Sequence, residues 1–328
     1  MTTTARPFGF RPWVLAGAVL ALVVLLAAPA LIVLSTRGGG EKTSTVATPH
    51  RVKVASQPTD IAVSQGTVWV ASGRDNGVVA IDARDLSRPE RHETGAAPLR
   101  LAIGKDSVWT ADAGDDTVTR VNPLIPGSVG RRIRIGSDAL DVAVGYDATW
   151  VTNGQRGTIT RIDPVSNHVL GPPIRTGNFP TALAIGANFV WVVNSGDGTV
   201  ARVDPREGLV IGRRTAVGRD PQDIAVGFGS VWVANRGDGT ITRLSAETGR
   251  RAGSPNDVGG EPSALAVASD GLLVLDTKSG DVLRLDPRTL STSRVTRVQG
   301  FPTAVAVGAG AAWVVDARAG TVTRIGGE

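Results

Sequence analysis

Apolar and polar residues alternate in short runs along most of this chain, and glycine, aspartate and asparagine separate the runs. In VWVVNSGDGTVARVDP, residues 190–205, two alternating runs lie on either side of a Gly-Asp-Gly turn, and an Asp-Pro pair follows them. Alternation with a period of two predicts β-strands, and a glycine that accepts positive φ favours a tight hairpin. We therefore expect residues 190–205 to form two antiparallel strands.

The same pattern occurs seven times. A strand of small residues precedes each copy, as in DIAVG at residues 223–227, and a less regular strand follows, as in RRIRIG at residues 131–136. Four short strands with a period of 40 or 41 residues are typical of a propeller blade. We predict an all-β fold, a seven-bladed β-propeller of four-stranded blades over residues 49–328. The period is marked by Trp69, Trp109, Trp150, Trp191, Trp232, Leu273 and Trp313.

One outer strand is missing after the third strand of the last copy. The segment HRVKVAS, residues 50–56, has the outer-strand pattern and precedes the first inner strand. We expect this N-terminal strand to pair with the last blade and close the ring, because closure removes exposed sheet edges.

Residues 13–34 form an uncharged apolar run before the propeller. As a helix these 22 residues would extend about 33 Å, enough to cross a hydrocarbon core of roughly 30 Å. Residues 1–12 are a short basic tail, and residues 35–48 have the composition of a flexible linker. We expect a single-pass transmembrane helix, a signal anchor, that holds the propeller outside the cytoplasm at the cell membrane. The alternative is secretion after cleavage near Ala30, at the end of the small-residue run APA.

Net charge argues against a nucleic-acid partner. The whole chain has a formal charge of +5, but residues 1–48 contain four basic and one acidic side chain, which leaves 31 Lys and Arg against 29 Asp and Glu in the propeller. So small an excess does not predict a basic groove. The chain has no cysteine, which excludes disulfides, thiolate chemistry and a lipid anchor on cysteine.

Three recurring residue types have structural interpretations. The tryptophans lie mid-strand between valines, so we expect them in the core and not around a stacked quinone. The third strands carry arginines whose stems should pack along the sheet with their heads paired near the rim: Arg120, Arg161, Arg202, Arg243, Arg284 and Arg324. An Asn or Asp that should cap the turn opens each hairpin from the second blade on: Asp112, Asn153, Asn194, Asn235, Asp276 and Asp316.

The segments VWVVNSGDGTVARVD and VWVANRGDGTITRL resemble the YVTN-type β-propeller repeat, which is related in fold to the streptogramin (virginiamycin B) lyase family. The resemblance covers about residues 50–328. It implies a seven-bladed propeller that is secreted or attached to a membrane. It also implies that some relatives linearise cyclic depsipeptide antibiotics with a histidine, a glutamate and magnesium on one face of the ring.

Those catalytic residues have no counterpart in this chain. Its histidines, His50, His92 and His168, fall in or beside outer strands, away from the channel mouth, and a lyase needs a positioned base. The Gly-Asp-Gly turns lack the alternating carboxylates of a calcium loop. We therefore expect a binding or sensor module without cofactor or metal, whose partner is a protein, peptide or polymer. The alternative is a lyase or hydrolase that uses carboxylates, with or without a metal, at the channel mouth.

The loops that enter the inner strands should share one face, the upper face, with the hairpins between second and third strands. Binding residues usually lie on such loops. Two positions there vary from blade to blade, namely the residue before the loop proline and the residue that opens the inner strand. We expect these side chains to lie outside the blade cores and to bind the partner: Asp60, Arg100, Asp141, Phe179, Asp220, Asp223 and Phe301.

Overall fold

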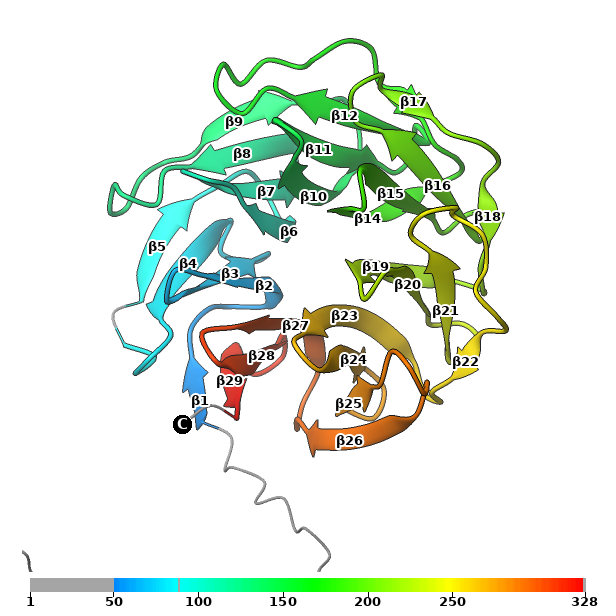
Figure 1. Cartoon of the computed structure of the whole chain (residues 1–328). Coiled ribbons are helices and arrows are strands. Elements are labelled where there is room, and N and C mark those ends of the chain that lie inside the picture. Colours follow the sequence, from blue (N-terminus) through cyan, green and yellow to red (C-terminus); the bar gives the residue numbers. More distant parts are fainter. Residues whose placement is uncertain (1–49, 88, 327–328) are drawn as a thin grey trace, which may run out of the picture. The chain divides into compact units, whose positions relative to one another are not determined.

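The computed structural model describes residues 50–87 and 89–326, and every regular element in this part of the chain is a β-strand (Figure 1). The strands form seven antiparallel sheets arranged as a ring. Each sheet runs from an inner strand near the ring axis to an outer strand at the circumference. The inner strand of every blade contacts the inner strands of both neighbours, including β2 against β27. The predicted seven-bladed propeller with four-stranded blades is confirmed.

The inner strands are β2 (Pro58–Ser64), β6 (Pro98–Ile103), β10 (Ala139–Gly145), β14 (Pro180–Gly186), β19 (Pro221–Gly227), β23 (Pro262–Ala268) and β27 (Pro302–Gly308). The second strands, which carry the repeated tryptophan, are β3 (Thr67–Ser72), β7 (Val108–Asp112), β11 (Ala148–Asn153), β15 (Phe189–Asn194), β20 (Ser230–Asn235), β24 (Gly271–Asp276) and β28 (Ala311–Asp316). The third strands are β4 (Gly77–Asp82), β8 (Thr117–Val121), β12 (Thr158–Ile162), β16 (Thr199–Asp204), β21 (Thr240–Ser245), β25 (Asp281–Leu285) and β29 (Thr321–Ile325).

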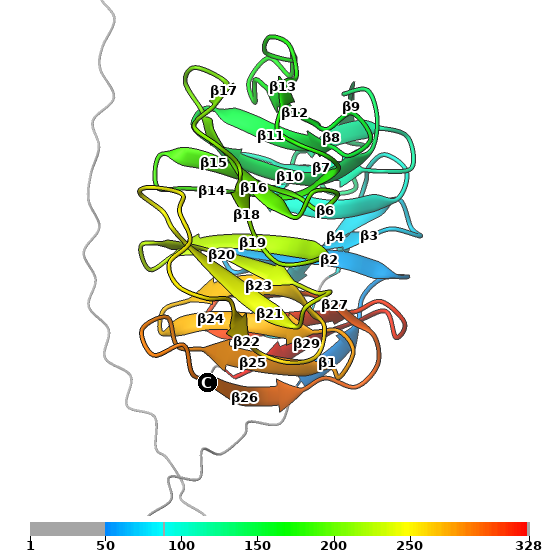
Figure 2. The same cartoon turned by 90° about the vertical axis from the view of Figure 1, so that its right-hand side faces the viewer.

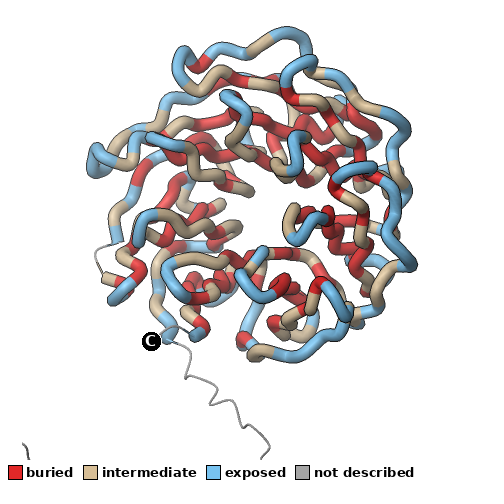
Figure 3. Tube along the Cα trace, in the orientation of Figure 1, coloured by how far each residue is buried: buried red, intermediate tan, exposed pale blue. Residues whose placement is uncertain are grey.

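The outer strands are shorter and less regular. They are β5 (Glu90–Glu93), β9 (Arg131–Arg134), β13 (Ile174–Arg175), β22 (Asn256–Asp257) and β26 (Thr292–Arg297), while two short strands, β17 (Leu209–Val210) and β18 (Thr215–Ala216), share β16 in the fourth blade. Buried residues are concentrated in the second and third strands of each blade, the inner strands are partly buried, and exposed residues gather on the loops and the circumference (Figure 3). The side view shows neighbouring sheets facing one another (Figure 2).

The outer position of the seventh blade is occupied by β1 (His50–Lys53). It pairs antiparallel with β29, from His50 opposite Arg324 to Lys53 opposite Thr321. Arg51 of β1 also donates to the buried Asp316 carboxylate and to the Thr321 hydroxyl, both at 2.6 Å. The seventh sheet therefore combines segments from the two ends of the described chain.

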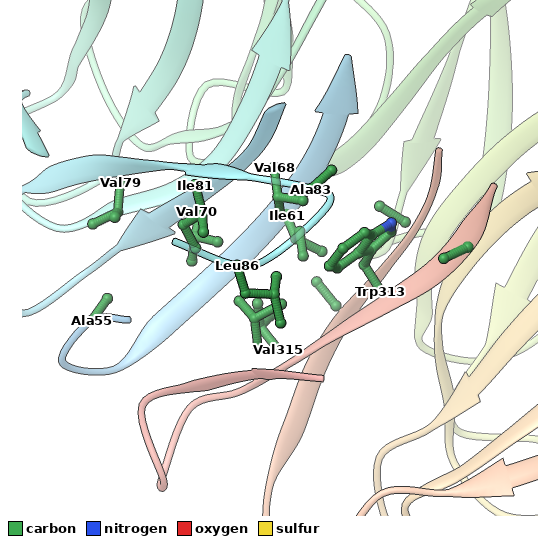
Figure 4. Close-up of a cluster of buried hydrophobic side chains, with 14 residues drawn as sticks. Ala55, Ile61, Val68, Val70, Val79, Ile81, Ala83, Leu86, Trp313 and Val315 are labelled. Atoms are coloured by element: carbon green, nitrogen blue, oxygen red, sulfur yellow. The ribbon is translucent and has the colours of Figure 1, made fainter. Parts of the chain in front are cut away.

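The tryptophans lie between adjacent blades, as predicted for core residues. Trp313 of blade 7 packs in one cluster with Ile61, Val68 and Leu86 of blade 1 (Figure 4). Five of the six repeated tryptophans are at most 1% exposed, and Trp69 is 6% exposed. Replacing one such residue by alanine is expected to cost about 3–5 kcal/mol.

Five of the six recurring arginines lie over the repeated tryptophans, and four of these also reach the next blade. Arg161 lies opposite Trp150 in the sheet, and its guanidinium sits 5.8 Å from the centre of the indole ring. The same head donates to the Pro205 carbonyl of the following blade at 3.1 Å. Arg202, Arg243 and Arg324 reach the next blade in the same way. The heads are thus paired, as predicted, and each of these four links two blades.

The Asn or Asp that opens each hairpin has two roles. Asp276 and Asp316 accept backbone N–H groups within their turns, as predicted for caps. Asn153 and Asn235 donate instead to threonine hydroxyls of the third strand. These side chains are buried, so the position serves packing between strands as well as the turn.

No helix in residues 50–87 or 89–326 is long and apolar enough to cross a membrane. The predicted tail, transmembrane helix and linker, residues 1–48, lie outside the described residues.

Candidate functional site at the channel mouth

Each inner strand carries a β-bulge close to its start. In the first blade Pro58 pairs with Ser72 and Asp60 with Ala71, so the pairing skips Thr59. A bulge leaves its extra residue unpaired and re-aims the side chain. The residues at this position, called the bulge ring below, are Thr59, Leu99, Leu140, Thr181, Gln222, Ser263 and Thr303.

The loops before the inner strands and the hairpins of the same blades lie on one face, as predicted. The Phe179 carbonyl accepts the Ser195 N–H at 3.0 Å, and the Phe301 carbonyl accepts the Ala317 N–H at 3.0 Å. All seven blades contain this hydrogen bond between the residue before the inner strand and the hairpin. Phe179 has φ of 52°, in the left-handed region that a non-glycine residue rarely adopts. The loop and hairpin together therefore hold the backbone at Phe179 in place.

Six residues of the bulge ring line a cavity of about 410 Å³ at the mouth of the channel, called the mouth cavity below. Ser263 is the bulge-ring residue outside that lining. Phe179 and Phe301, from blades 4 and 7, add exposed aromatic surface, with 40% and 56% of each residue exposed. Arg100 provides the charged side chain of the wall. The mouth cavity is therefore mainly apolar, with hydroxyl, amide and guanidinium groups between the apolar residues.

Three aspartates at the start of alternate inner strands connect the blades. The Asp60, Asp141 and Asp223 carboxylates each accept a backbone N–H from the following blade, at 2.8, 2.7 and 2.7 Å. The N–H donors are Leu101, Leu183 and Leu265. Asp141 and Asp223 use their second oxygen for an N–H of their own strand. One aspartate therefore serves two blades, which explains why Ala182 and Ala264 can occupy the position in blades 4 and 6.

These contacts correct the expectation that the strand-opening side chains lie outside the blade cores. Asp141 is 9% exposed and hydrogen-bonded through both carboxylate oxygens. The sequence suggested exposure because this position varies from blade to blade. The change between aspartate and alanine over blades 3 to 6 instead reflects the sharing of one carboxylate between neighbouring blades.

The charge of Arg100 interacts with these three carboxylates. Its Nη1 lies 3.5 Å from Asp60 Oδ1. Burial acts to lower the pKa of Arg100, but the negative charges of Asp60, Asp223 and Asp141 outweigh it and raise the pKa above its ordinary value. Burial raises the pKa of Asp141 to about 7, although Arg100 acts in the opposite direction, and burial also raises the pKa of Asp223. The Arg100 guanidinium in the wall of the mouth cavity thus lies near three carboxylates that are not part of the cavity lining.

The seven predicted site residues divide into three groups. Arg100, Phe179 and Phe301 line the mouth cavity. The three strand-opening aspartates lie around Arg100 and hold the inner strands. Asp220 lies elsewhere, in the cleft between blades 5 and 6, where its carboxylate is 2.8 Å from Arg236.

The prediction missed the bulge ring. The residue after the loop proline varies between Thr, Leu, Gln and Ser. The residue before the loop proline and the residue that opens the inner strand were selected because of the same kind of variation. Strict alternation assigns this residue to the sheet face between blades. The bulge turns it toward the channel, and hydrophobic periodicity does not reveal a bulge.

The histidines lie at the circumference, as predicted from the sequence. His50 and His92 belong to the outer strands β1 and β5, and His168 precedes the short bridge that Val169 makes with Ile162. His92 is fully buried, with its ring centre 5.6 Å from that of Trp69. Within the described residues, no three His, Cys, Asp or Glu side chains form a group that could hold a metal ion.

No family model matches the chain, and no curated protein matches it. Solved propellers share its fold. Virginiamycin B lyase from Staphylococcus aureus has a TM-score of 0.74 at 14% identity, over 85% of this chain and 98% of that chain. A catalytically inactive variant of that lyase with quinupristin has a TM-score of 0.74 at 16% identity, with the same coverage of 85% and 98%. The WD40 propeller domain of Doa1 has a TM-score of 0.70 at 12% identity, over 86% and 96%.

At these identities the likeness establishes the fold alone. The expected relation to the streptogramin lyase propellers is therefore confirmed for the fold. The YVTN-type repeat remains a prediction from the sequence.

Proposed function

We propose that this propeller is a binding module that holds its ligand in the mouth cavity without chemical conversion. The supporting observation is the convergence of two exposed phenylalanines and Arg100, from three blades, on one cavity of about 410 Å³. Cavities with mostly apolar walls and a few polar groups are the usual form of small-ligand sites. Phe179 and Phe301 are the anchors of this proposal.

The polar groups of the cavity favour a ligand with carbonyl groups, such as a peptide segment. Arg100 has guanidinium N–H groups beyond the one near Asp60, and the surrounding carboxylates offset its positive charge. Gln57 in the cavity lining adds amide N–H groups that can donate to a ligand carbonyl.

Hydrogen bonding around the aspartates argues against a catalytic carboxylate. Both oxygens of Asp141 and of Asp223 already accept backbone N–H groups. A general base must reach the proton that it removes, and these oxygens face the backbone. We therefore expect quinupristin to remain intact when it is incubated with the full-length protein. A linearised product detected by mass spectrometry would favour the lyase alternative.

We further propose that residues 13–34 anchor the protein in the cell membrane with the propeller outside the cytoplasm. The support is the uncharged run of 22 residues and the polar linker that follows it. Alkaline phosphatase fused after Glu328 should be active, because the enzyme requires an extracytoplasmic location. An inactive fusion, with a cytoplasmic reporter active at the same position, would reverse the orientation.

The binding proposal is tested with the peptide acetyl-Phe-Leu-Asn-amide and the full-length protein, by calorimetric titration. We expect binding that falls at least about tenfold in Phe179→Ala and in Phe301→Ala, because each change removes an aromatic anchor. Phe228→Ala is the matched control, since Phe228 is 41% exposed in the turn at the opposite end of the inner strands. Equal losses in all three variants, or binding that no variant changes, would contradict the proposal.

A further inference from the structure

A second cavity opens beside the mouth cavity, between the seventh and first blades. It has a volume of about 650 Å³ and is called the 7–1 cleft below. Gln57, Phe301 and Ala317 line both the 7–1 cleft and the mouth cavity. A ligand anchored on Phe301 can therefore extend from one into the other over the upper face.

The 7–1 cleft is lined by three exposed basic side chains from three separate segments. Lys53 ends β1, Arg74 lies in the hairpin between β3 and β4, and Arg318 lies in the hairpin between β28 and β29. No carboxylate lines the cleft. Among the ion pairs of residues 50–87 and 89–326, none includes any of these three cations.

The acidic side chain next to Arg74 is hydrogen-bonded to two serines. Asp75 Oδ2 accepts the Ser56 N–H and the Ser72 hydroxyl, both at 2.7 Å. In blade 7 the corresponding hairpin residue is Ala319, so the seventh hairpin adds no carboxylate of its own there. The cleft lining thus lacks a carboxylate for two reasons. Alanine replaces the acidic residue at position 319, and the Asp75 carboxylate is already hydrogen-bonded to Ser56 and Ser72.

The cleft between blades 5 and 6 provides an internal comparison. It lies at the equivalent place in the repeat and also contains two basic side chains, Arg236 and Lys278. Here Arg236 is 2.8 Å from Asp220, and Lys278 is 3.8 Å from Glu261. The fold therefore does not require unpaired cations at this place. Of these two clefts, the 7–1 cleft is the one whose cations have no acidic partners.

We infer that the 7–1 cleft binds a carboxylate group of the ligand whose apolar part occupies the mouth cavity, which makes the ligand an acidic peptide segment. The inference rests on the proposed function, because it uses Phe301 as the common anchor. Charge complementarity is its main support, since three unpaired cations around one cleft attract an anion. The carboxylate can come from an acidic side chain or from a peptide C-terminus, and the two sources are separated by experiment.

Three matched peptides test the inference on the full-length protein. They are acetyl-Phe-Leu-Asn-amide, which is neutral, acetyl-Phe-Leu-Asp-amide, with a side-chain carboxylate, and acetyl-Phe-Leu-Asn with a free C-terminal carboxylate. We expect one or both acidic peptides to bind about tenfold more tightly than the neutral one at low salt, because solvent-exposed ion pairs are individually weak and three act together. This preference should shrink as salt is added.

Two double variants locate the effect. Arg74→Gln with Arg318→Gln should abolish the preference for the acidic peptides and leave the affinity of the neutral peptide unchanged. Arg236→Gln with Lys278→Gln removes the same charge from the paired cleft and should preserve the preference. Equal affinity for acidic and neutral peptides, or equal loss in both double variants, would overturn the inference while binding in the mouth cavity stands. The affinity of the neutral peptide for Phe301→Ala tests binding in the mouth cavity separately, because this peptide has no carboxylate for the 7–1 cleft.

Discussion

Asp112 shows how one residue can differ from its repeat-equivalents in the core. Blades 3, 4 and 5 carry asparagine at this position, and blade 2 carries an aspartate whose carboxylate is fully buried. The hydroxyls of Thr110, Thr117 and Thr119 donate to it, and none of these donors is charged. Burial raises the pKa of Asp112 from 3.8 to about 6, against the effect of these hydrogen bonds. The folded state therefore binds the proton more tightly than the unfolded state.

Stability should consequently fall as pH rises through this range. The contribution of Asp112 is fully present below the unfolded pKa of about 4 and is lost as pH rises through the folded pKa. Asp112→Asn should raise the free energy of unfolding at pH 8 by up to roughly 3 kcal/mol, with little gain at pH 4. Urea titrations at both pH values measure the difference. Asn153→Asp, the reverse change in blade 3, should destabilise more at pH 8 than at pH 4, and pH-independent effects of both variants would contradict this account.

Asp223 tests the link between blades at the level of a single side chain. Its carboxylate satisfies Ile224 N–H in its own strand and Leu265 N–H in the next blade. Asp223→Ala should lower the free energy of unfolding by roughly 1–3 kcal/mol, because two strand N–H groups lose their acceptor. Asp257→Ala, an exposed change on the outer strand β22, is the control. If both variants unfold at the same denaturant concentration, the carboxylate does not stabilise the ring.

Among the elements, the regular strands could be predicted from sequence and the bulges could not. Trp69, Trp109 and the equivalent residues recur at a fixed period, and alternation with tight turns defines the strands around them. The bulge at Thr59 depends on how β2 meets β3, which is a relation between two strands. Contacts between strands likewise limited the prediction of the site. Sequence variation singled out Arg100, Phe179 and Phe301, which line the mouth cavity in the structure, whereas the role of Asp141 depends on a contact with another blade.

The strand β1 offers a test at the scale of an element. Arg51 Nη2 lies 2.6 Å from Asp316 Oδ2, and the Asp316 side chain is fully buried. Arg51→Ala should lower the free energy of unfolding by roughly 1–3 kcal/mol, because it leaves a buried acceptor without its charged donor. Arg84→Ala is the control, since the Arg84 side chain is 89% exposed and 3.5 Å from Asp82. Equal stability of the two variants in urea would show that Arg51 does not hold β1 in place.

At the scale of the whole molecule, β1 pairs with β29 in the seventh sheet, and contacts between inner strands run from blade to blade and include the pair β2 and β27. Deleting residues 49–56 from the full-length chain should therefore lower the melting temperature sharply, because it exposes the edge of β29 and removes the Arg51 ion pair. Circular dichroism during heating measures this change. An unchanged melting temperature would contradict the proposal that β1 closes the ring.

The central claim is that the mouth cavity is the binding site, and fluorine NMR tests it residue by residue. Incorporation of 4-fluorophenylalanine labels all six phenylalanines of the full-length chain, among them Phe179, Phe301, Phe189 and Phe228. Signals are assigned by single substitution, and acetyl-Phe-Leu-Asn-amide is then added. The account predicts that the Phe179 and Phe301 signals shift together with ligand concentration, while the Phe189 and Phe228 signals stay in place. A titration in which Phe228 shifts, and Phe179 and Phe301 do not, would contradict it.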